Sequence, residues 1–142
     1  MDIKELINAA LKARDRAYAP YSHFKVGAAL LTESGRVYAG CNIENAAYSP
    51  TNCAERTAFF KAVSEGERNF IAIAITGDRE DRKTPGIFSY PCGVCRQVMF
   101  EFCGEDFKII VATDAAHYQM YTLGELAPHS FGKELQSGGD KG

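Results

Sequence analysis

Five cysteines are the residues of this sequence best suited to chemistry, and three of them precede or open two predicted helices. Cys92 and Cys95 form a Cys-x-x-Cys pair, and Cys53 lies two residues before Glu55. Thiolates in such a pair suit Zn²⁺, but a redox dithiol also lies at a helix N-terminus, where its thiol pKa is lowered. The pair by itself therefore leaves metal binding, redox chemistry and an incidental spacing open.

Cys53 favours the metal interpretation, because three thiolates make an open zinc site whose fourth position is left for water. A structural zinc site normally has four protein ligands. Cys41 stays open as a fourth ligand, whereas Cys103 lies near the far end of its predicted helix and is a poor candidate. Glu55 could take the proton of a metal-bound water, although an acidic residue is favoured in the first turn of any helix.

The pattern of apolar residues predicts the elements that must position these side chains. Arg14 interrupts the apolar spacing of the first predicted helix and is expected, with Arg16, on a solvent-exposed face. Gly35 suits a tight turn between the first two strands. In chain order, we predict a helix over 3–18, strands over 24–31 and 36–41, a helix over 51–66, a strand over 70–76, a helix from 91 to about 102, a strand over 107–113, a short strand over 117–121 and a helical turn over 123–126.

This order predicts an α/β fold with a mixed sheet covered by helices on both faces. Helices that follow central strands begin at the carboxyl edge of such a sheet, where ligands usually bind. Both helices that carry grouped cysteines are expected to begin there. The 142 residues fit one domain, which we place at 1–132, with 133–142 as a flexible C-terminal tail.

Composition argues against several functional classes. The chain has 16 Lys and Arg against 18 Asp and Glu, a net charge of −2, and no basic run, which counts against a nucleic-acid partner. No apolar stretch approaches the ~18 residues that a membrane span requires, and no signal-peptide pattern is present. We therefore expect a cytoplasmic protein without membrane contact, in which an odd number of cysteines argues against a disulfide framework.

The ordered motifs resemble the zinc-dependent cytidine deaminases, and within them the small homotetrameric type. The resemblance covers about residues 5–132, nearly the whole chain. It is carried by Cys53-Ala54-Glu55 and by the segments 24–30 (FKVGAAL), 40–48 (GCNIENAAY), 91–97 (PCGVCRQ) and 124–131 (GELAPHSF). It implies the cytidine deaminase-like fold, a three-layer α-β-α arrangement with a mixed five-stranded sheet.

The resemblance also implies the reaction, which is hydrolysis of cytidine and 2′-deoxycytidine to uridine and 2′-deoxyuridine with release of ammonia, as in pyrimidine salvage. Cys53, Cys92 and Cys95 would hold one catalytic Zn²⁺ per subunit. Glu55 would protonate the ring N3, activate water for attack at C4 and deliver a proton to the departing ammonia; this mechanism is the family's. Arg56 would donate hydrogen bonds to the ligating thiolates.

Substrate contacts are implied for four further positions. Asn42 and Glu44 would bind the ribose hydroxyl, Phe24 would stack on the pyrimidine, and the Ala54 backbone would read the Watson–Crick edge of the base. Taken without the resemblance, an aromatic residue such as Phe24 in an apolar run is usually part of a core. Local chemistry likewise favours turn or edge-strand roles for Asn42 and Glu44.

Phe131 would reach into the pocket of a neighbouring subunit, so that a homotetramer shares its active sites. The rivals within the enzyme class are a polynucleotide deaminase and a deaminase of a cytosine-containing antibiotic. Outside the hydrolases, the alternatives are a thiol redox protein that uses Cys92 and Cys95, and a non-catalytic zinc-stabilised binding module. The last two leave the spacing of Cys53 and Glu55 unexplained.

Overall fold

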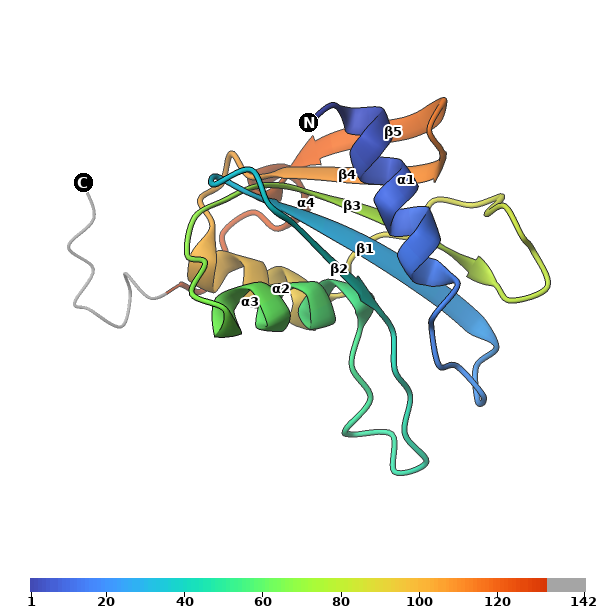
Figure 1. Ribbon diagram of the computed structural model, residues 1–142. Helices are drawn as coiled ribbons and strands as arrows, with labels where there is room; N and C mark the ends of the chain where they lie inside the picture. Colours follow the sequence, from blue (N-terminus) through green and yellow to red (C-terminus); the bar gives the residue numbers. More distant parts are fainter. Residues whose placement is uncertain (133–142) are drawn as a thin grey trace.

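A mixed five-stranded sheet with strand order β2-β1-β3-β4-β5 forms the centre of the fold (Figure 1). The computed structural model describes residues 1–132, so the predicted tail at 133–142 lies outside the described residues. Only β3 and β4 pair in parallel within this sheet. In chain order the elements are α1 (Ile3–Arg14), β1 (Phe24–Thr32), β2 (Val37–Cys41), α2 (Ala54–Ser64), β3 (Phe70–Arg79), α3 (Gly93–Phe102), β4 (Lys108–Asp114), β5 (His117–Thr122) and α4 (Leu123–Leu126).

Helix α1 covers one face of the sheet, and α2 and α3 cover the other (Figure 1). Successive strand residues point to opposite faces, so Leu30 of β1 packs on the α2 and α3 side while its neighbour Ala29 packs against α1. In the same way, Ile109 and Ile110 of β4 contribute to opposite cores. The predicted element order, the mixed sheet and the three-layer architecture are confirmed.

Two strand glycines allow helices to lie very close to the sheet. A Cβ atom at Gly27 would lie 2.1 Å from the carbonyl oxygen of Ala10 in α1. A Cβ atom at Gly40 would lie 2.6 Å from the carbonyl oxygen of Ala54, the first residue of α2. Close backbone approach is a usual reason for glycine within a strand, and at Gly40 it sets the position where α2 begins.

The starts of α2 and α3 meet at one edge of the sheet because of strand direction. Strands β2 and β3 are each antiparallel to β1, so they run in the same direction and their carboxyl ends lie at the same edge. The chain enters α2 after β2 and α3 after β3. The sequence-based expectation that both cysteine-bearing helices begin at this edge is therefore confirmed.

Three predicted helices are shorter than their sequence patterns suggest, and α3 differs least, beginning at Gly93 instead of 91. Helix α1 ends at Arg14 instead of continuing to Tyr18, because the backbone of Tyr18 pairs with residues 42–44: its N–H donates to the Asn42 carbonyl at 3.0 Å, and its carbonyl accepts from the Glu44 N–H at 2.9 Å. Helix α2 begins at Ala54 rather than at 51, because residue 52 forms a bridge with residue 43 in extended conformation.

The prediction that Arg14 lies on a solvent-exposed face is wrong. Its side chain is 3% exposed and donates to four backbone carbonyls, those of Lys25 (3.0 Å), Asp78 (3.0 Å), Arg79 (2.7 Å) and Lys83 (3.2 Å). These carbonyls belong to the start of β1, the end of β3 and the following loop. Arg14 therefore satisfies buried backbone groups that the sheet itself leaves unpaired.

Within the described residues, no helix is long and apolar enough to cross a bilayer.

Candidate active site

Three cysteine side chains converge where α2 and α3 begin. The sulfur atoms of Cys53, Cys92 and Cys95 all lie within 4.8 Å of one another, and the Sγ atoms of Cys53 and Cys92 are 3.8 Å apart. Cys53 and Cys92 are the N-cap residues of their helices, and the Cys92 Sγ accepts a hydrogen bond from the Cys95 N–H. Two helix N-termini, each with a partial positive charge, therefore lie at the sulfur cluster.

The cluster offers three ligands and not four. Within residues 1–132, no further His, Cys, Asp or Glu joins the group of ligand atoms. Cys41 lines a separate cavity beside β2, and Cys103 caps the far end of α3. The possibility of Cys41 as a fourth ligand is therefore excluded, and the donor set fits a zinc site with an open position.

Charges around the sulfur atoms favour thiolate at Cys53. Hydrogen bonds from Cys95 and Arg56 lower the pKa of Cys53 to about 5, against the opposing effect of burial. The Arg56 Nη2 atom lies 3.1 Å from the Cys53 Sγ. The pKa of Cys95 is raised by its hydrogen bond with Cys53 and by burial. A thiolate at Cys95 would lie next to the thiolate of Cys53, and the repulsion between the two like charges opposes its formation. A bound divalent cation offsets this repulsion, so the chemistry of the donor set fits Zn²⁺.

Glu55 lies in the first turn of α2, two residues from Cys53, and its side chain is 4% exposed. Burial, followed by the nearby Cys53 thiolate, raises the pKa of Glu55 to about 7. Its carboxylate does not belong to the ligand group of the cluster. The arrangement places a buried carboxyl group beside the thiols without using it as a ligand.

Asn42 holds the first residues of β1 in place. Its side-chain oxygen accepts from the Val26 N–H at 2.8 Å, and its amide nitrogen donates to the Phe24 carbonyl at 2.8 Å. These two bonds extend the pairing of β1 with the chain beyond β2 and fix Phe24 at the start of the strand. Phe24 is half-buried, with Arg79 of β3 opposite it.

Glu44 organises the loop that leads into β1. One of its carboxylate oxygens accepts from the Tyr21 N–H at 3.0 Å and the Ser22 N–H at 3.1 Å, and the other accepts from the Ser22 hydroxyl. Burial alone would raise the pKa of Glu44, but the hydrogen bonds from Ser22 and Tyr21 hold that pKa below its usual value. Glu44 also lines a cavity of about 390 Å³ together with Tyr21, Tyr48 and neighbouring residues.

The structure brings only some of the predicted site residues together. Ala54 is fully buried beside Glu55 at the start of α2. The side chain of Phe131 is 55% exposed, and its carbonyl accepts from the Gln97 amide at 2.9 Å. None of the three cysteines lines the cavity at Glu44, so this cavity contains only part of the predicted site.

Backbone strain marks three positions that the sequence did not reveal. His23, Tyr48 and His129 have φ values of 59°, 64° and 55°, a region that non-glycine residues rarely adopt. His23 precedes Phe24, Tyr48 lines the cavity at Glu44, and His129 lies two residues before Phe131. Strained backbone often occurs at functional sites, but a non-glycine residue carries no sequence signal for it.

Comparisons with known proteins point to one family. The family model described as the cytidine and deoxycytidylate deaminase zinc-binding region matches residues 1–113. The cytidine deaminases of Sporosarcina psychrophila and Halalkalibacterium halodurans are each 51% identical over 134 residues, which cover 94% of this chain and 94% and 97% of theirs. The crystal structure of cytidine deaminase from Burkholderia pseudomallei matches with a TM-score of 0.83 at 44% identity, covering 92% of this chain and 100% of that one.

Proposed function

This chain belongs to the cytidine and deoxycytidylate deaminase family, and from that membership we propose that it is a zinc-dependent hydrolase acting on cytidine and 2′-deoxycytidine. The products are uridine or 2′-deoxyuridine and ammonia, and the expected physiological role is pyrimidine salvage. The observation that carries this function is the cluster of three sulfur atoms within 4.8 Å of one another, beside a buried glutamate. A redox dithiol or a structural zinc site gives no role to that glutamate.

Cys53, Cys92 and Cys95 would hold Zn²⁺, which when bound would supply Lewis-acid activation of the attacking water. Glu55 moves the protons. It accepts a proton from the attacking water and passes it to ring N3 as the oxygen adds to C4; the second proton of that water is then delivered to the amino nitrogen, which leaves as ammonia while the C4 carbonyl forms. Burial of Glu55 keeps its carboxyl group away from bulk water during these transfers.

Four positions bind and orient the nucleoside in this proposal. Phe24 stacks on the pyrimidine, and its fixation by Asn42 through hydrogen bonds to β1 supports that role. The Ala54 backbone, directly before Glu55, reads the edge of the base. Asn42 and Glu44 bind the ribose hydroxyl, and the position of Glu44 on a cavity wall supports its part.

We place the active enzyme in a homotetramer in which Phe131 completes the pocket of a neighbouring subunit. Large apolar side chains exposed on the α2 and α3 side support an interface there: Phe60 is 49%, Val94 57% and Phe131 55% exposed. Exposed apolar side chains that gather into one patch often mark protein–protein contacts. The residues 1–132 form the single catalytic domain, and the expected location is the cytoplasm.

The reaction is tested with purified protein by measuring uridine and ammonia from cytidine before and after a strong chelator removes zinc. Turnover that disappears with the metal and returns on addition of Zn²⁺ supports the proposal. A panel of 2′-deoxycytidine, single-stranded oligonucleotides and a cytosine-containing antibiotic separates the rivals within the enzyme class. Turnover of the oligonucleotide alone would contradict a nucleoside substrate.

A further inference from the structure

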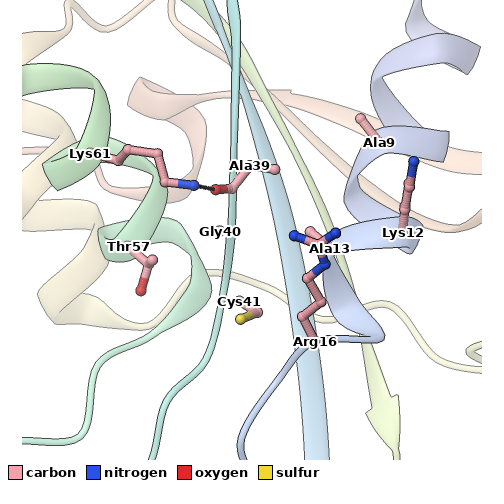
Figure 2. Close-up of a pocket in the computed structure, with 9 residues that line it drawn as sticks. All are labelled: Ala9, Lys12, Ala13, Arg16, Ala39, Gly40, Cys41, Thr57 and Lys61. Atoms are coloured by element: carbon pink, nitrogen blue, oxygen red, sulfur yellow. Dashed lines mark hydrogen bonds between the residues drawn. The ribbon is translucent and has the colours of Figure 1, made fainter. Parts of the chain in front are cut away.

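A second cavity, of about 350 Å³, lies beside β2 between α1 and α2 (Figure 2). Lys12 in α1 and Arg16 just after it line one side, and Lys61 of α2 lines the other. The rest of the lining consists of small side chains, among them Cys41. The volume falls within the range of about 300–1,000 Å³ that is typical of small-molecule sites.

The lining of this cavity carries positive charge without a compensating acid. Among the described residues, its lining has three cationic side chains and no Asp or Glu. Within residues 1–132, none of the three cations forms an ion pair, and the Lys61 ammonium group donates to the Ala39 carbonyl (Figure 2). Three like charges around one hollow repel one another, and a bound anion would relieve that repulsion.

The open edge of the sheet adds backbone donors to the same cavity. In the part of the chain that the structure describes, β2 is an edge strand that pairs only with β1. The Asn42 N–H donates to Val26 in β1 at 3.2 Å, and because hydrogen-bonded and non-hydrogen-bonded pairs alternate in an antiparallel ladder, the N–H groups of Ala39 and Cys41 point away from β1. Both residues line the cavity, so their N–H groups lie on the same side as the three cations, together with their carbonyl oxygens, of which that of Ala39 is occupied by Lys61.

We propose that this cavity binds a compact phosphate-bearing anion of the diphosphate or triphosphate class. Such an anion carries several negative charges and many acceptor oxygens, which match two ammonium groups, a guanidinium fork and edge N–H groups. The site is separate from the three clustered cysteines, because none of them lines it. The proposal therefore does not depend on the deaminase activity.

The direct test is calorimetric titration at low ionic strength with inorganic tripolyphosphate and, in parallel, with magnesium-free ATP. We expect saturable binding of one anion per chain that weakens as salt is added, because these charges are partly exposed. Similar affinity for both probes assigns recognition to the phosphate chain, whereas clearly tighter ATP binding assigns it to a nucleotide. Absence of saturable binding of either probe would overturn the proposal.

A matched pair of variants localises the binding. The double variant Lys12→Gln, Arg16→Gln removes two charges from the cavity, and Lys4→Gln, Lys108→Gln removes two exposed charges that do not line it. We expect the first to weaken binding at least tenfold and the second to leave it within about twofold. Thermal unfolding should follow the same pattern, since a ligand that binds only the folded state raises Tm. Equal weakening in both variants would show non-specific attraction, with the cavity cations serving only to keep the edge strand from pairing.

Discussion

Ile43 and Asn52 exchange two backbone hydrogen bonds, each 2.9 Å long. Ile43 lies between Asn42 and Glu44, and Asn52 directly precedes Cys53. This one bridge therefore joins the segment proposed to bind the nucleoside to the first of the three clustered cysteines. It fixes these two segments of the chain relative to each other.

Replacing Arg56 with Gln should weaken zinc binding about 10- to 100-fold, the usual cost of losing a partner of a metal ligand. The guanidinium group donates to the Cys53 Sγ at 3.1 Å and helps to offset the negative charge of the thiolates. Competition with a chromophoric chelator measures the zinc affinity. Arg68→Gln is the control, because this exposed arginine donates to the backbone carbonyls of Val63, near the end of α2, and of Glu67, just after it. Equal zinc affinity in the Arg56 variant and the wild type would contradict the assignment.

The Glu44→Gln variant should raise KM for cytidine about tenfold or more while kcat falls much less. The amide keeps one acceptor for the loop N–H groups of residues 21 and 22 but loses the charge that is proposed to bind the ribose hydroxyl. Steady-state kinetics with cytidine measure both constants. A KM equal to that of the wild type would remove Glu44 from the substrate site and leave it with a purely structural role.

Substituting Met for Arg14 should lower the free energy of unfolding by about 3 kcal/mol or more, because several buried carbonyl groups lose their donor. The side chain donates to four carbonyls. Urea denaturation measures the change. The exposed neighbour Arg16 is the matched position, where Arg16→Met should shift stability by no more than about 0.5 kcal/mol. Similar losses at both positions would contradict the structural role of Arg14.

Asp78 should make the stability of the protein depend on pH in the acid range. Hydrogen bonds from the N–H groups of Gly86 (2.8 Å) and Arg79 (2.7 Å) hold its pKa below the ordinary value of 3.8. Its stabilising effect is therefore complete above that value and is lost as the pH falls through the lowered pKa of the folded state.

The matching variant is Asp78→Asn, whose amide provides an acceptor for only one of the two N–H groups. It should be less stable than the wild type at pH 6, and the difference should shrink as the pH approaches 3 and below. Urea denaturation across this range measures both proteins. A difference that stays constant with pH would show that the carboxylate charge does not contribute.

The order of the elements was predictable because buried strands such as 70–76 and 107–113 carry continuous apolar runs. The convergence of the cysteines was also predictable, since strand direction places both helix starts at one edge. The end of α1 was not, because the pairing of Tyr18 with a distant segment outweighs its local apolar spacing. Long-range partners also explain why the burial of Arg14 and the hydrogen bonds of Ser22 with Glu44 left no local signal. Whether Cys41 is a fourth metal ligand could likewise be decided only from distances in the structure.

The central claim is that Glu55 moves protons in the reaction and does not hold the metal. The most direct measurement is the zinc content and the cytidine turnover of the Glu55→Gln variant, made side by side on one preparation. We predict about one zinc ion per chain, as in the wild type, together with turnover reduced at least 10²-fold, the lower end of what a general acid–base group usually contributes. Near-normal uridine formation by the zinc-loaded variant would contradict the account.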